Sequence, residues 1–533
     1  MAKSGSMAKA IPRWARVELN LESNTKFANP IQEATLMAAV IPPSKHERAV
    51  EGFWDGGNTW KIRFAPDEIG EWQSNLFLVK RDGEVLQTAS GHFVCGPASG
   101  DTPFELHGPI RLAANKRHLE HADGTPFFWL ADTAWNGPLR STEAEWELYL
   151  RERQRQKFTA VQWVATQWRA APDGDQQGQL AFTGHEQIAI NPAFFQRMDQ
   201  RIKTTTRAGL LNVPVLLWAI GAGSNPTVDP GFGLPEDQAI LLARYMVARW
   251  SAYPVVWILA GDGKYQGGYA ERWRRIGRAL FNDKPHAPVA MHCGGQQWPA
   301  EEFRREQWLD ILGYQSGHGD GEETWRWLAE GPPARDWSVE PRLFQLNLEP
   351  AYENHVAYQS GQPHAPQAVR RAIYWSLLNA PTAGVTYGGH GIWGWDDGSG
   401  PPVDHPNSGT PLPWRQALTM PGAEQMAQVA TLFSKIEWWR LRPEPLLVVN
   451  QPGAEAVTQT IMAAQAEAGD LVVVYLSVGG AVAIRTTRLK PNLQASWFNP
   501  RTGERAPIGP VDNTQIAHFQ APDQEDWVLI MSR

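Results

Sequence analysis

The sequence predicts a multidomain protein in which a central (β/α)8 TIM barrel is flanked by an N-terminal and a C-terminal β-sandwich. Three observations support this fold class. Between residues 104 and 442, eight apolar segments alternate with helical patterns, as in parallel sheets built from βα units. These segments become polar and aromatic toward their carboxyl ends, where barrels carry their functional residues. The regions on either side contain short β-rich segments separated by Gly, Pro, Asp and Asn.

The barrel is predicted from its strands and helices in turn. Eight strands are expected, at 126–135, 158–168, 211–221, 255–262, 288–295, 309–319, 343–350 and 384–395. Helices are expected between them, at 142–156, 192–209, 235–250, 269–281, 323–331, 366–379 and 423–439. Several helices begin with Pro, Ser or Thr, which is typical of helix starts. A doubly wound open sheet is the main alternative, but no GxGxxG or GxxxxGK[ST] motif follows any strand.

The two flanking domains are predicted at 11–97 and 443–533, with the barrel at 104–442. Segments such as TWKIRF (59–64) alternate with strand period, and PASGDTP (97–103) is expected to be a linker. The C-terminal region contains similar segments, among them EPLLVVN (444–450) and DLVVVYLSV (470–478). We expect both sandwiches to buttress the barrel, and glycan binding by them is the alternative. Trp54, in the turn GFWDGG, is the exception, because a Trp on a turn could reach over the barrel mouth and close one end of the cleft.

The composition excludes several classes of protein. Lys and Arg number 49 against 56 Asp and Glu, a net charge of −7 without basic clusters, so nucleic-acid binding is not expected. No segment approaches the roughly 20 apolar residues of a membrane helix. The only cysteines, Cys95 and Cys293, form no CxxC motif, which argues against a disulfide scaffold or a thiolate metal site. The segment MAKSGSMAKA lacks the apolar stretch of a signal peptide, which predicts a cytoplasmic protein unless a leader has been removed.

Tryptophan is unusually abundant. The chain has 26 Trp, against 11 Tyr and 19 Phe, and most of the Trp lie within the predicted barrel. Trp combines a flat apolar face with one N–H donor, so it serves both core packing and stacking on sugar rings. The excess of Trp therefore favours a carbohydrate site.

The strand ends supply carboxylates, imidazoles and aromatic faces, and no Ser or Cys in a nucleophile elbow. Asp262 ends the fourth strand and Glu349 ends the seventh, on roughly opposite sides of the barrel mouth. Two carboxyl groups so placed can flank a glycosidic bond, one donating a proton and the other attacking the anomeric carbon or activating water. We predict Asp262 and Glu349 as the catalytic pair. The predicted substrate-binding residues are Asp132, Trp135, Gln167, Trp168, Trp218, Lys264, Tyr265, His292, Gln315, Tyr352, Glu353, His390, Trp393 and Trp395.

Structural roles are the alternative for several of these residues. A strand-end acid can cap a helix or pair with Arg, and this alternative stays open for Asp132 and Glu353. His292, His318 and His390 can serve as ordinary hydrogen-bonding groups. A metal site is not expected, because the first strand ends in DTAW without the His pair of metal-dependent barrels. We expect no cofactor.

Three motifs of the barrel give it a family resemblance: FFWLADTAW, VVWILAGDGKY and LNLEPAYE. They resemble the apiosidase-like catalytic domain family, which includes glycoside hydrolases that release apiose from rhamnogalacturonan II. The resemblance places the acid/base on Asp262 and the nucleophile on Glu349. VEGFWDGGNTWKIRFAPDEIGEW (50–72) is similar to the β-sandwich module that commonly precedes this barrel. ASWFNPRTGE (495–504) is similar to the β domain, labelled collagen-binding, that follows it.

The resemblance and the residues together imply a retaining glycoside hydrolase that acts on a plant or microbial polysaccharide or its side chains. The expected partner is therefore an oligosaccharide or polysaccharide. The alternative from another class is a non-catalytic carbohydrate-binding protein that keeps the barrel and uses its acids for hydroxyl contacts.

Overall fold

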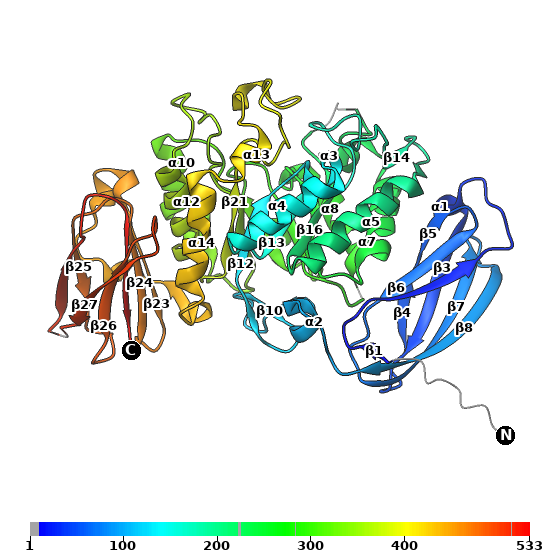
Figure 1. The fold of residues 1–533 in the computed structure, drawn as a ribbon, viewed down its shortest axis with the longest axis horizontal. Coiled ribbons are helices and arrows are strands. Elements are labelled where there is room, and N and C mark those ends of the chain that lie inside the picture. The colour runs from blue at the N-terminus through cyan, green and yellow to red at the C-terminus, as the bar shows by residue number, and fades with distance from the viewer. Residues whose placement is uncertain (1–9, 222–224, 283, 513) are drawn as a thin grey trace.

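In a computed structural model, residues 10–221, 225–282, 284–512 and 514–533 are described. The expectation about a signal peptide falls mainly on residues 1–9, which lie outside the described residues. Three modules follow one another along the long axis of the molecule, with the barrel in the middle and one β module at each end (Figure 1). The predicted fold class is confirmed, while the exact domain limits remain a prediction.

The central sheet is a nearly closed parallel barrel of eight strands in the order β20-β19-β18-β17-β16-β13-β12-β21. It closes where the two outer strands, β20 and β21, lie side by side. The strands are buried along their whole length, as expected for a parallel sheet covered by helices. In chain order they are β12 (Trp129–Thr133), β13 (Ala160–Val164), β16 (Leu211–Trp218), β17 (Trp257–Gly261), β18 (Val289–His292), β19 (Ile311–Gln315), β20 (Phe344–Glu349) and β21 (Gly384–Gly388).

Helices surround the barrel, and their starts follow local capping rules. Thr142 and Glu145 form a capping box that starts α4, and Pro192 occupies the first turn of α5. The long helices are α4 (Glu143–Arg155), α5 (Pro192–Arg207), α7 (Glu236–Trp250), α8 (Ala270–Phe281), α10 (Glu322–Glu330), α12 (Pro366–Leu378) and α14 (Pro421–Phe433). Short helices in the connections are α3 (Gly137–Arg140), α6 (Pro230–Gly233), α9 (Ala300–Phe303), α11 (Pro332–Asp336) and α13 (Trp414–Ala417).

A small antiparallel sheet lies below the barrel, at the end opposite the yellow loops (Figure 1). The sequence prediction missed it. It follows α2 (Pro103–His107) and consists of β9 (Ile110–Leu112), β10 (Leu119–His121) and β11 (Pro126–Phe127). These strands are two or three residues long, too short for a strand pattern to be recognised in the sequence.

The N-terminal module packs a five-stranded sheet, β1-β8-β7-β3-β4, against a three-stranded sheet, β2-β6-β5. Alternate side chains of β3 are buried, which confirms the predicted strand period. Its elements are β1 (Ile11–Pro12), β2 (Val17–Glu22), α1 (Pro30–Glu33), β3 (Ala34–Ile41), β4 (Arg48–Glu51), β5 (Phe53–Gly56), β6 (Thr59–Phe64), β7 (Gly70–Lys80) and β8 (Val85–Gly96).

Buried charges join this module to the barrel. Asp199 of α5 accepts hydrogen bonds from Arg63 of β6 and Arg249 of α7, each at 2.8 Å. Arg249 also pairs with Asp55 of β5 at 2.7 Å. All four side chains are less than a tenth exposed. We call these four residues the Asp199 network. Removing one partner from such a network leaves an uncompensated buried charge, so the network fixes the module against the barrel.

The C-terminal module contains a six-stranded sheet, β22-β23-β24-β29-β26-β27, and a two-stranded sheet, β25-β28. The strand expected at 444–450 is wrong, because Pro445–Leu447 forms a 3-10 turn. Proline at that position removes a donor from any strand ladder. The strands are β22 (Leu441–Pro443), β23 (Ile461–Ala466), β24 (Leu471–Leu476), β25 (Ala481–Arg485), β26 (Gln494–Phe498), β27 (Arg505–Pro510), β28 (Ile516–Gln520) and β29 (Trp527–Ser532).

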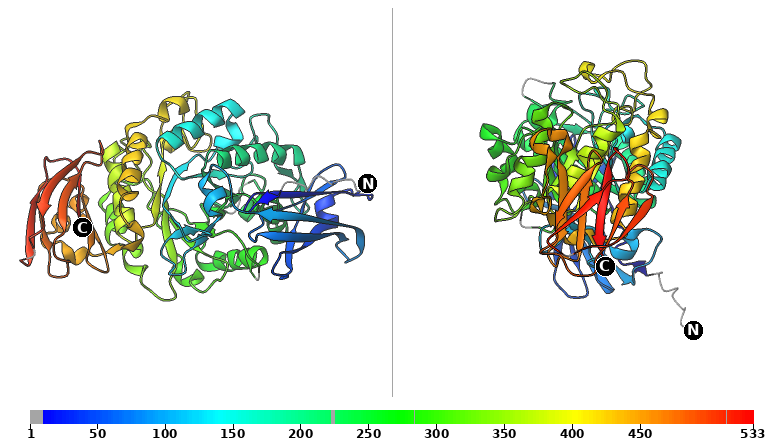
Figure 2. Two further views of the ribbon diagram at one scale, coloured as in Figure 1. Left: turned by 60° about the horizontal axis from the view of Figure 1, so that its bottom comes forward. Right: turned by 90° about the vertical axis from the view of Figure 1, so that its left-hand side faces the viewer.

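A second buried ion pair fixes this module to α12 of the barrel. Arg370 donates two hydrogen bonds to Asp526, at 2.7 and 2.8 Å, and Tyr475 donates a third at 3.0 Å. Tyr374 of α12 stacks on Tyr475 with 4.5 Å between ring centroids. The left view of Figure 2 again shows the two β modules at opposite ends of the barrel.

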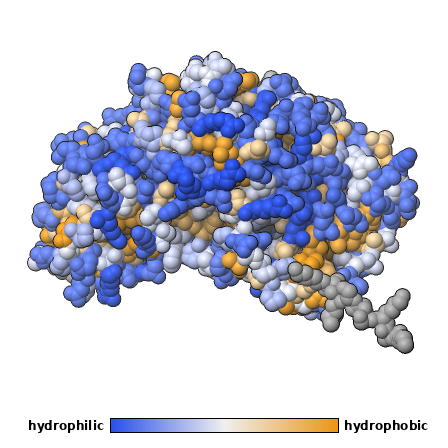
Figure 3. Space-filling view, in the orientation of Figure 1, coloured by the Kyte–Doolittle hydropathy of each residue, from blue (hydrophilic) through white to orange (hydrophobic). Residues whose placement is uncertain are grey.

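The face drawn in Figure 3 is largely hydrophilic across all three modules, with small apolar patches between the polar ones. This is the usual surface of a protein whose large apolar side chains are in its cores. In the part of the chain that is described, no helix combines the length and apolarity that crossing a bilayer requires.

Candidate active site

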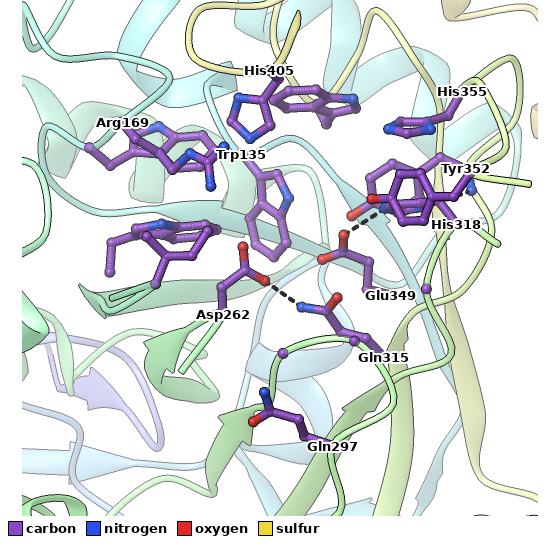
Figure 4. A pocket seen from close by; sticks show the side chains of 18 of the residues that line it. Trp135, Arg169, Asp262, Gln297, Gln315, His318, Glu349, Tyr352, His355 and His405 are labelled. Atoms are coloured by element: carbon purple, nitrogen blue, oxygen red, sulfur yellow. Dashed lines mark hydrogen bonds and ion pairs between the residues drawn. The ribbon is translucent and has the colours of Figure 1, made fainter. Parts of the chain in front are cut away.

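A cavity of about 360 Å³ opens at the carboxyl ends of the barrel strands, the end at which barrels carry their functional residues. Figure 4 shows Asp262 and Glu349 turned toward each other across it, with Trp135 between and behind them. The lining residues are Trp135, Trp168, Arg169, Trp218, Ile220, Asp262, Lys264, Gly294, Gly295, Gln297, Gln315, Gly317, His318, Glu349, Tyr352, His355, Tyr358, Trp393 and His405.

Asp262 immediately follows β17 and has a backbone φ of 49°, in the left-handed region that Asp tolerates better than most residues. This conformation turns its N–H toward Nδ1 of His292, at 3.3 Å. The Gln315 amide donates to Oδ1 at 2.5 Å. Burial and the nearby Glu349 carboxylate raise the pKa of Asp262, although His292 and Gln315 oppose this. The environment therefore favours the protonated acid.

Glu349 ends β20, and each of its carboxylate oxygens faces an imidazole. Nε2 of His318 is 2.9 Å from Oε1, and Nε2 of His292 is 3.2 Å from Oε2. The Tyr352 N–H donates to Nδ1 of His318, and the Asp262 N–H donates to Nδ1 of His292. Because each Nδ1 accepts an N–H, the tautomer that fits these contacts carries its proton on Nε2, which faces Glu349 in both rings.

These donors determine the charge of Glu349. Burial alone would raise the pKa of Glu349, but the hydrogen-bond donors His292 and His318 hold it well below its ordinary value. The side-chain oxygen of Asn347 accepts a hydrogen bond from the Glu349 N–H at 3.3 Å, which holds the backbone of Glu349 in place. Glu349 is therefore an ionised carboxylate, next to an acid whose pKa is raised.

The spacing of the pair is short. A carboxylate oxygen of Asp262, a ring nitrogen of His292 and a carboxylate oxygen of Glu349 all lie within 4.8 Å of one another. Carboxyl groups about 5–5.5 Å apart are typical of retaining glycosidases, whereas inverting enzymes need about 6.5–9.5 Å to admit a water molecule. The geometry and the opposed pKa directions both suit an acid paired with a nucleophile.

Aromatic rings form one wall of the cavity. Trp218 lies 4.2 Å from Trp168 and 6.0 Å from Trp135, measured between ring centroids, and Trp393 stands 4.9 Å from His405. The indole N–H of Trp218 is buried and has no hydrogen-bond partner among the described residues. A buried donor of this kind fits an acceptor on a bound ligand.

Imidazole and phenol groups form the opposite wall. His355 stacks on His318 with 4.3 Å between centroids. Burial, together with the neighbouring His318 and His390, lowers the pKa of His355 to about 2, and burial lowers the pKa of His405 to about 4. Both rings are therefore neutral at pH 7. Tyr358 is 63% exposed and forms part of the rim.

Two cations border the acid. Arg169 lines the cavity and pairs with Asp404 at 3.0 Å. Lys264, two residues after Asp262, lines it as well. Lys264 is exposed, and it forms no ion pair with any residue that the structure describes. Its ammonium nitrogen lies 5.9 Å from the centroid of the Tyr269 ring. This side of the cavity therefore offers hydrogen-bond donors with positive charge.

Seven of the predicted substrate-binding residues line the cavity: Trp135, Trp168, Trp218, Lys264, Gln315, Tyr352 and Trp393. The predicted catalytic pair lies there as well. The roles assigned to all of them remain predictions, because position alone does not test a role.

The other seven predicted residues do not line the cavity, and most of them brace the barrel mouth instead. Asp132 is fully buried, where it pairs with Arg153 at 2.6 Å. Glu353 accepts hydrogen bonds from Tyr387 and from the N–H groups of Gly422 and Ala423, which begin α14. These placements favour the structural alternative for both acids.

The remaining five have similar explanations. Gln167 bonds the backbone of Phe182 and Ala181, within its own loop. His390 accepts from Trp393, and Trp395 stacks on Trp414 at 4.3 Å. Tyr265 turns back to the Ala260 backbone, and His292 lies beneath the two carboxyl groups without reaching the cavity. Strand-end position predicts proximity to the mouth but not the direction of a side chain.

The sequence reasoning omitted several lining residues: Arg169, Gln297, His355, Tyr358 and His405. All of them lie in loops after the strands rather than in the strands themselves. His318 was considered only as an ordinary hydrogen-bonding group. The run HGDGEE (318–323) carried no spacing that would have pointed to Glu349.

Metal binding has one geometric candidate among the described residues, the triplet of Asp262, His292 and Glu349. The donors already present argue against it. Gln315 and His318 donate to the carboxylates, and Nδ1 of His292 is occupied by an N–H donor. Carboxylate–imidazole metal sites instead present free lone pairs to the ion.

Trp54 does not reach the barrel mouth, so that expectation is wrong. It lines a separate hollow between β5 and the start of α5. Its carbonyl oxygen accepts from Tyr245 at 2.8 Å, which ties it to the outer surface of the barrel.

Comparisons with known proteins agree with this architecture. The family model described as "Apiosidase-like, catalytic domain" matches residues 113–440. A domain of unknown function, DUF5060, matches residues 10–76, and the model described as "Putative collagen-binding domain of a collagenase" matches residues 443–532. No curated protein matches the sequence.

Solved structures share the fold at low identity. One titled "Glycoside hydrolase" is 23% identical, has a TM-score of 0.70, and aligns over 81% of this chain and 98% of its own. A glycoside hydrolase family 5 structure from Bacteroides vulgatus ATCC 8482 is 21% identical with a TM-score of 0.70, over 82% and 95%. A third structure, from the same strain, is 18% identical with a TM-score of 0.72, over 98% and 99%.

The likeness at this level of identity establishes the three-module fold, and the match over most of the barrel establishes the family. The chain belongs to the apiosidase-like catalytic domain family.

Proposed function

We propose that this protein is a retaining glycoside hydrolase that cleaves a glycosidic bond in a plant or microbial polysaccharide or its side chains. One observation carries the proposal: two carboxyl groups face one cavity with an oxygen of each within 4.8 Å of the other, and their pKa values are displaced in opposite directions. A general acid must be protonated and a carboxylate nucleophile must be ionised, and opposed pKa displacements favour these two states. The family resemblance makes apiosyl side chains of rhamnogalacturonan II the first substrates to examine.

In the first step, an oxygen of the Glu349 carboxylate attacks the anomeric carbon while the bond from that carbon to the glycosidic oxygen breaks. Asp262 transfers its proton to the departing oxygen, which leaves as a neutral hydroxyl. A glycosyl ester on Glu349 and an ionised Asp262 remain. His292 and His318 hold the two Glu349 oxygens, so the nucleophile starts in a fixed orientation.

In the second step, Asp262 removes a proton from an incoming water, whose oxygen attacks the same anomeric carbon. The ester bond to Glu349 breaks, which restores the carboxylate, and Asp262 is again protonated. Loss of the negative charge on Glu349 in the ester favours an ionised Asp262 at this stage, because the like charge that raised its pKa is absent.

The walls suggest what the substrate presents. Trp135, Trp168 and Trp393 offer faces for a sugar ring. Trp218, Arg169 and Lys264 offer donors only, which suits an acceptor-rich group such as a uronate carboxylate on the leaving-group side. We propose an acidic sugar next to the scissile bond.

The test is hydrolysis of a panel of defined oligosaccharides by the wild type and by Asp262→Ala, Glu349→Ala and Glu323→Ala. Glu323 is exposed on the first turn of α10 and serves as the matched control. We expect both catalytic-site variants to lose roughly three or more orders of magnitude in kcat, and the control to keep full activity. Proton NMR of the first product should show the substrate's own anomeric configuration.

Inversion of configuration, or full activity of Glu349→Ala, would overturn the proposal. The alternative is a non-catalytic carbohydrate-binding protein, which predicts binding without cleavage across the panel. Under the hydrolase proposal, the affinity of Glu349→Ala for an oligosaccharide that the wild type cleaves should lie within about tenfold of the wild-type affinity.

A further inference from the structure

The hollow beside Trp54 is a second cavity, distinct from the catalytic one, since no residue lines both. Its volume is about 630 Å³, and it is open to solvent. One side is the β5–β6 hairpin of the N-terminal module and the other is the first turn of α5. The lining residues are Trp54, Asp55, Gly56, Gly57, Thr59, Lys61, Asn191, Pro192, Ala193 and Gln196.

The floor of the hollow is rigid because both modules hold it. The Gln196 amide donates to the Asp55 backbone oxygen at 2.8 Å, and Tyr245 donates to the Trp54 oxygen. Asp55 itself belongs to the Asp199 network and pairs with Lys61 at 2.7 Å. A surface fixed in this way loses little conformational entropy when a ligand binds.

Trp54 is held so that part of its ring stays accessible. Its N–H donates to the Gly57 oxygen at 2.9 Å, and the ring packs partly on the cores of both modules. Gly56 and Gly57 have φ values of 106° and 55°, and a Cβ at Gly57 would meet no atom within 4 Å. The turn therefore adds no side chain above the ring.

The polar groups around the ring suit a neutral sugar. The Lys61 ammonium is balanced by Asp55, so the hollow has no unpaired cation for an anionic group. Lys61 supplies N–H donors, and Gln196, whose nitrogen is already used, supplies a side-chain oxygen as acceptor. An aromatic face with amide and ammonium groups at its edge matches the apolar face and equatorial hydroxyls of a pyranose.

The hollow lies on the substrate side of the barrel. Helices that follow parallel strands begin at the carboxyl end of the sheet, so the first turn of α5 is at the same rim as the catalytic cavity. One segment links the two cavities, because the connection from β13 to α5 contributes Trp168 and Arg169 to the first and Asn191 to the second. Figure 1 places α5 and β14 (Phe182–Thr183), which lies in this connection, beside the N-terminal module.

We propose that the Trp54 hollow is an ancillary carbohydrate-binding site that holds a neutral sugar residue of a polysaccharide whose side chain enters the catalytic cavity. The site would raise affinity for polymers and leave the cleavage of short substrates unchanged. Because binding requires no hydrolysis, it can be measured whether or not the proposed activity is correct.

The experiment is affinity electrophoresis of full-length Glu349→Ala protein through gels that contain rhamnogalacturonan II, galactan or xylan. Trp54→Ala is added to this background to remove the ring. Ala193→Glu is a second variant, since it fills the hollow from an exposed first-turn position where a carboxylate suits the helix dipole. Trp439→Ala, which removes a Trp that lines neither cavity, is the matched control.

We expect at least one polymer to retard Glu349→Ala and its Trp439→Ala control, and both hollow variants to weaken that binding about tenfold. Ala193→Glu should keep the thermal unfolding midpoint of the background, which separates loss of the site from loss of the fold. Equal retardation of all four proteins, or retardation of none by any of the three polymers, would overturn the inference. If the wild type cleaves no glycan but the two hollow variants still lose retardation, the ancillary site stands and the proposed hydrolase does not.

Discussion

Replacing His318 tests how Glu349, the proposed nucleophile, is kept ionised. The Nε2 atom of His318 is 2.9 Å from Glu349 Oε1, and the Tyr352 N–H donates to the other ring nitrogen. His318→Leu removes this donor and keeps a side chain of similar bulk against His355. His318→Gln restores an N–H donor and is the matched control.

The size of the effect follows from the kind of hydrogen bond that is lost. A hydrogen bond to a charged group is worth about 1.5–3 kcal/mol, and one pKa unit corresponds to about 1.36 kcal/mol. His318→Leu should therefore raise the pKa of Glu349 by roughly one to two units, with His292 left as the other donor. A Glu with a raised pKa is protonated at higher pH, so activity is lost earlier on acidification.

The assay is the pH dependence of kcat/KM, whose acidic limb reports the essential base of the free enzyme. The acidic limb of His318→Leu should move upward by about one to two pH units, and that of His318→Gln by clearly less. An acidic limb that does not move in His318→Leu, with the protein folded, would refute the account of how Glu349 stays charged. A uniform loss of kcat at all pH values would assign His318 a purely structural role.

Four further predictions concern the junction, the metal and the substrate. Arg249→Met should lower the free energy of unfolding by about 3–5 kcal/mol in denaturant titrations, since Asp55 and Asp199 would each lose one of two cationic partners while their charges stay buried. A loss below about 1 kcal/mol would contradict the Asp199 network. Although burial opposes it, Arg249 and Arg63 hold the pKa of Asp199 below its ordinary value. The stability that Asp199 confers is therefore present above its unfolded-state pKa and should fall as pH drops through its folded-state pKa. Acid unfolding followed by circular dichroism measures this, and an unchanged acid transition in Asp199→Asn would contradict it. Dialysis against a chelator should leave hydrolysis unchanged, whereas loss restored by a divalent ion would favour a metal at the Asp262 triplet. Lys264→Met should raise KM about tenfold for substrates with a uronate beside the scissile bond and leave KM for neutral ones unaltered; equal effects on both would contradict the acidic-sugar proposal.

Much of the fold could be predicted because its signals are local. All eight barrel strands appear inside the predicted segments, since a buried parallel strand is a continuous apolar run in the sequence. The sheet below the barrel could not be predicted, because strands of two or three residues carry no period. The segment EPLLVVN looks β-rich, but Pro445 prevents it from joining a ladder.

The site was predictable only in part, and for a geometric reason. A strand-end position brings a residue to the mouth, which is how Asp262 and Glu349 were found. Whether the side chain then enters the cavity depends on the pleat and on partners from distant segments. Asp132 meets Arg153, and Tyr265 bends back to its own strand. Loop residues such as Tyr358 and His405 reach the cavity through folding of long connections that the sequence does not specify locally.

The position of His292 has a consequence for turnover. One ring contacts the backbone of Asp262, the proposed acid, through one nitrogen and the carboxylate of Glu349, the proposed nucleophile, through the other. Displacement of either residue is therefore transmitted to its counterpart, so we expect the gap between the two carboxyl groups to stay nearly constant when their protonation changes. The imidazole acts as a spacer, and its fixed width sets which reaction geometry the two acids can support.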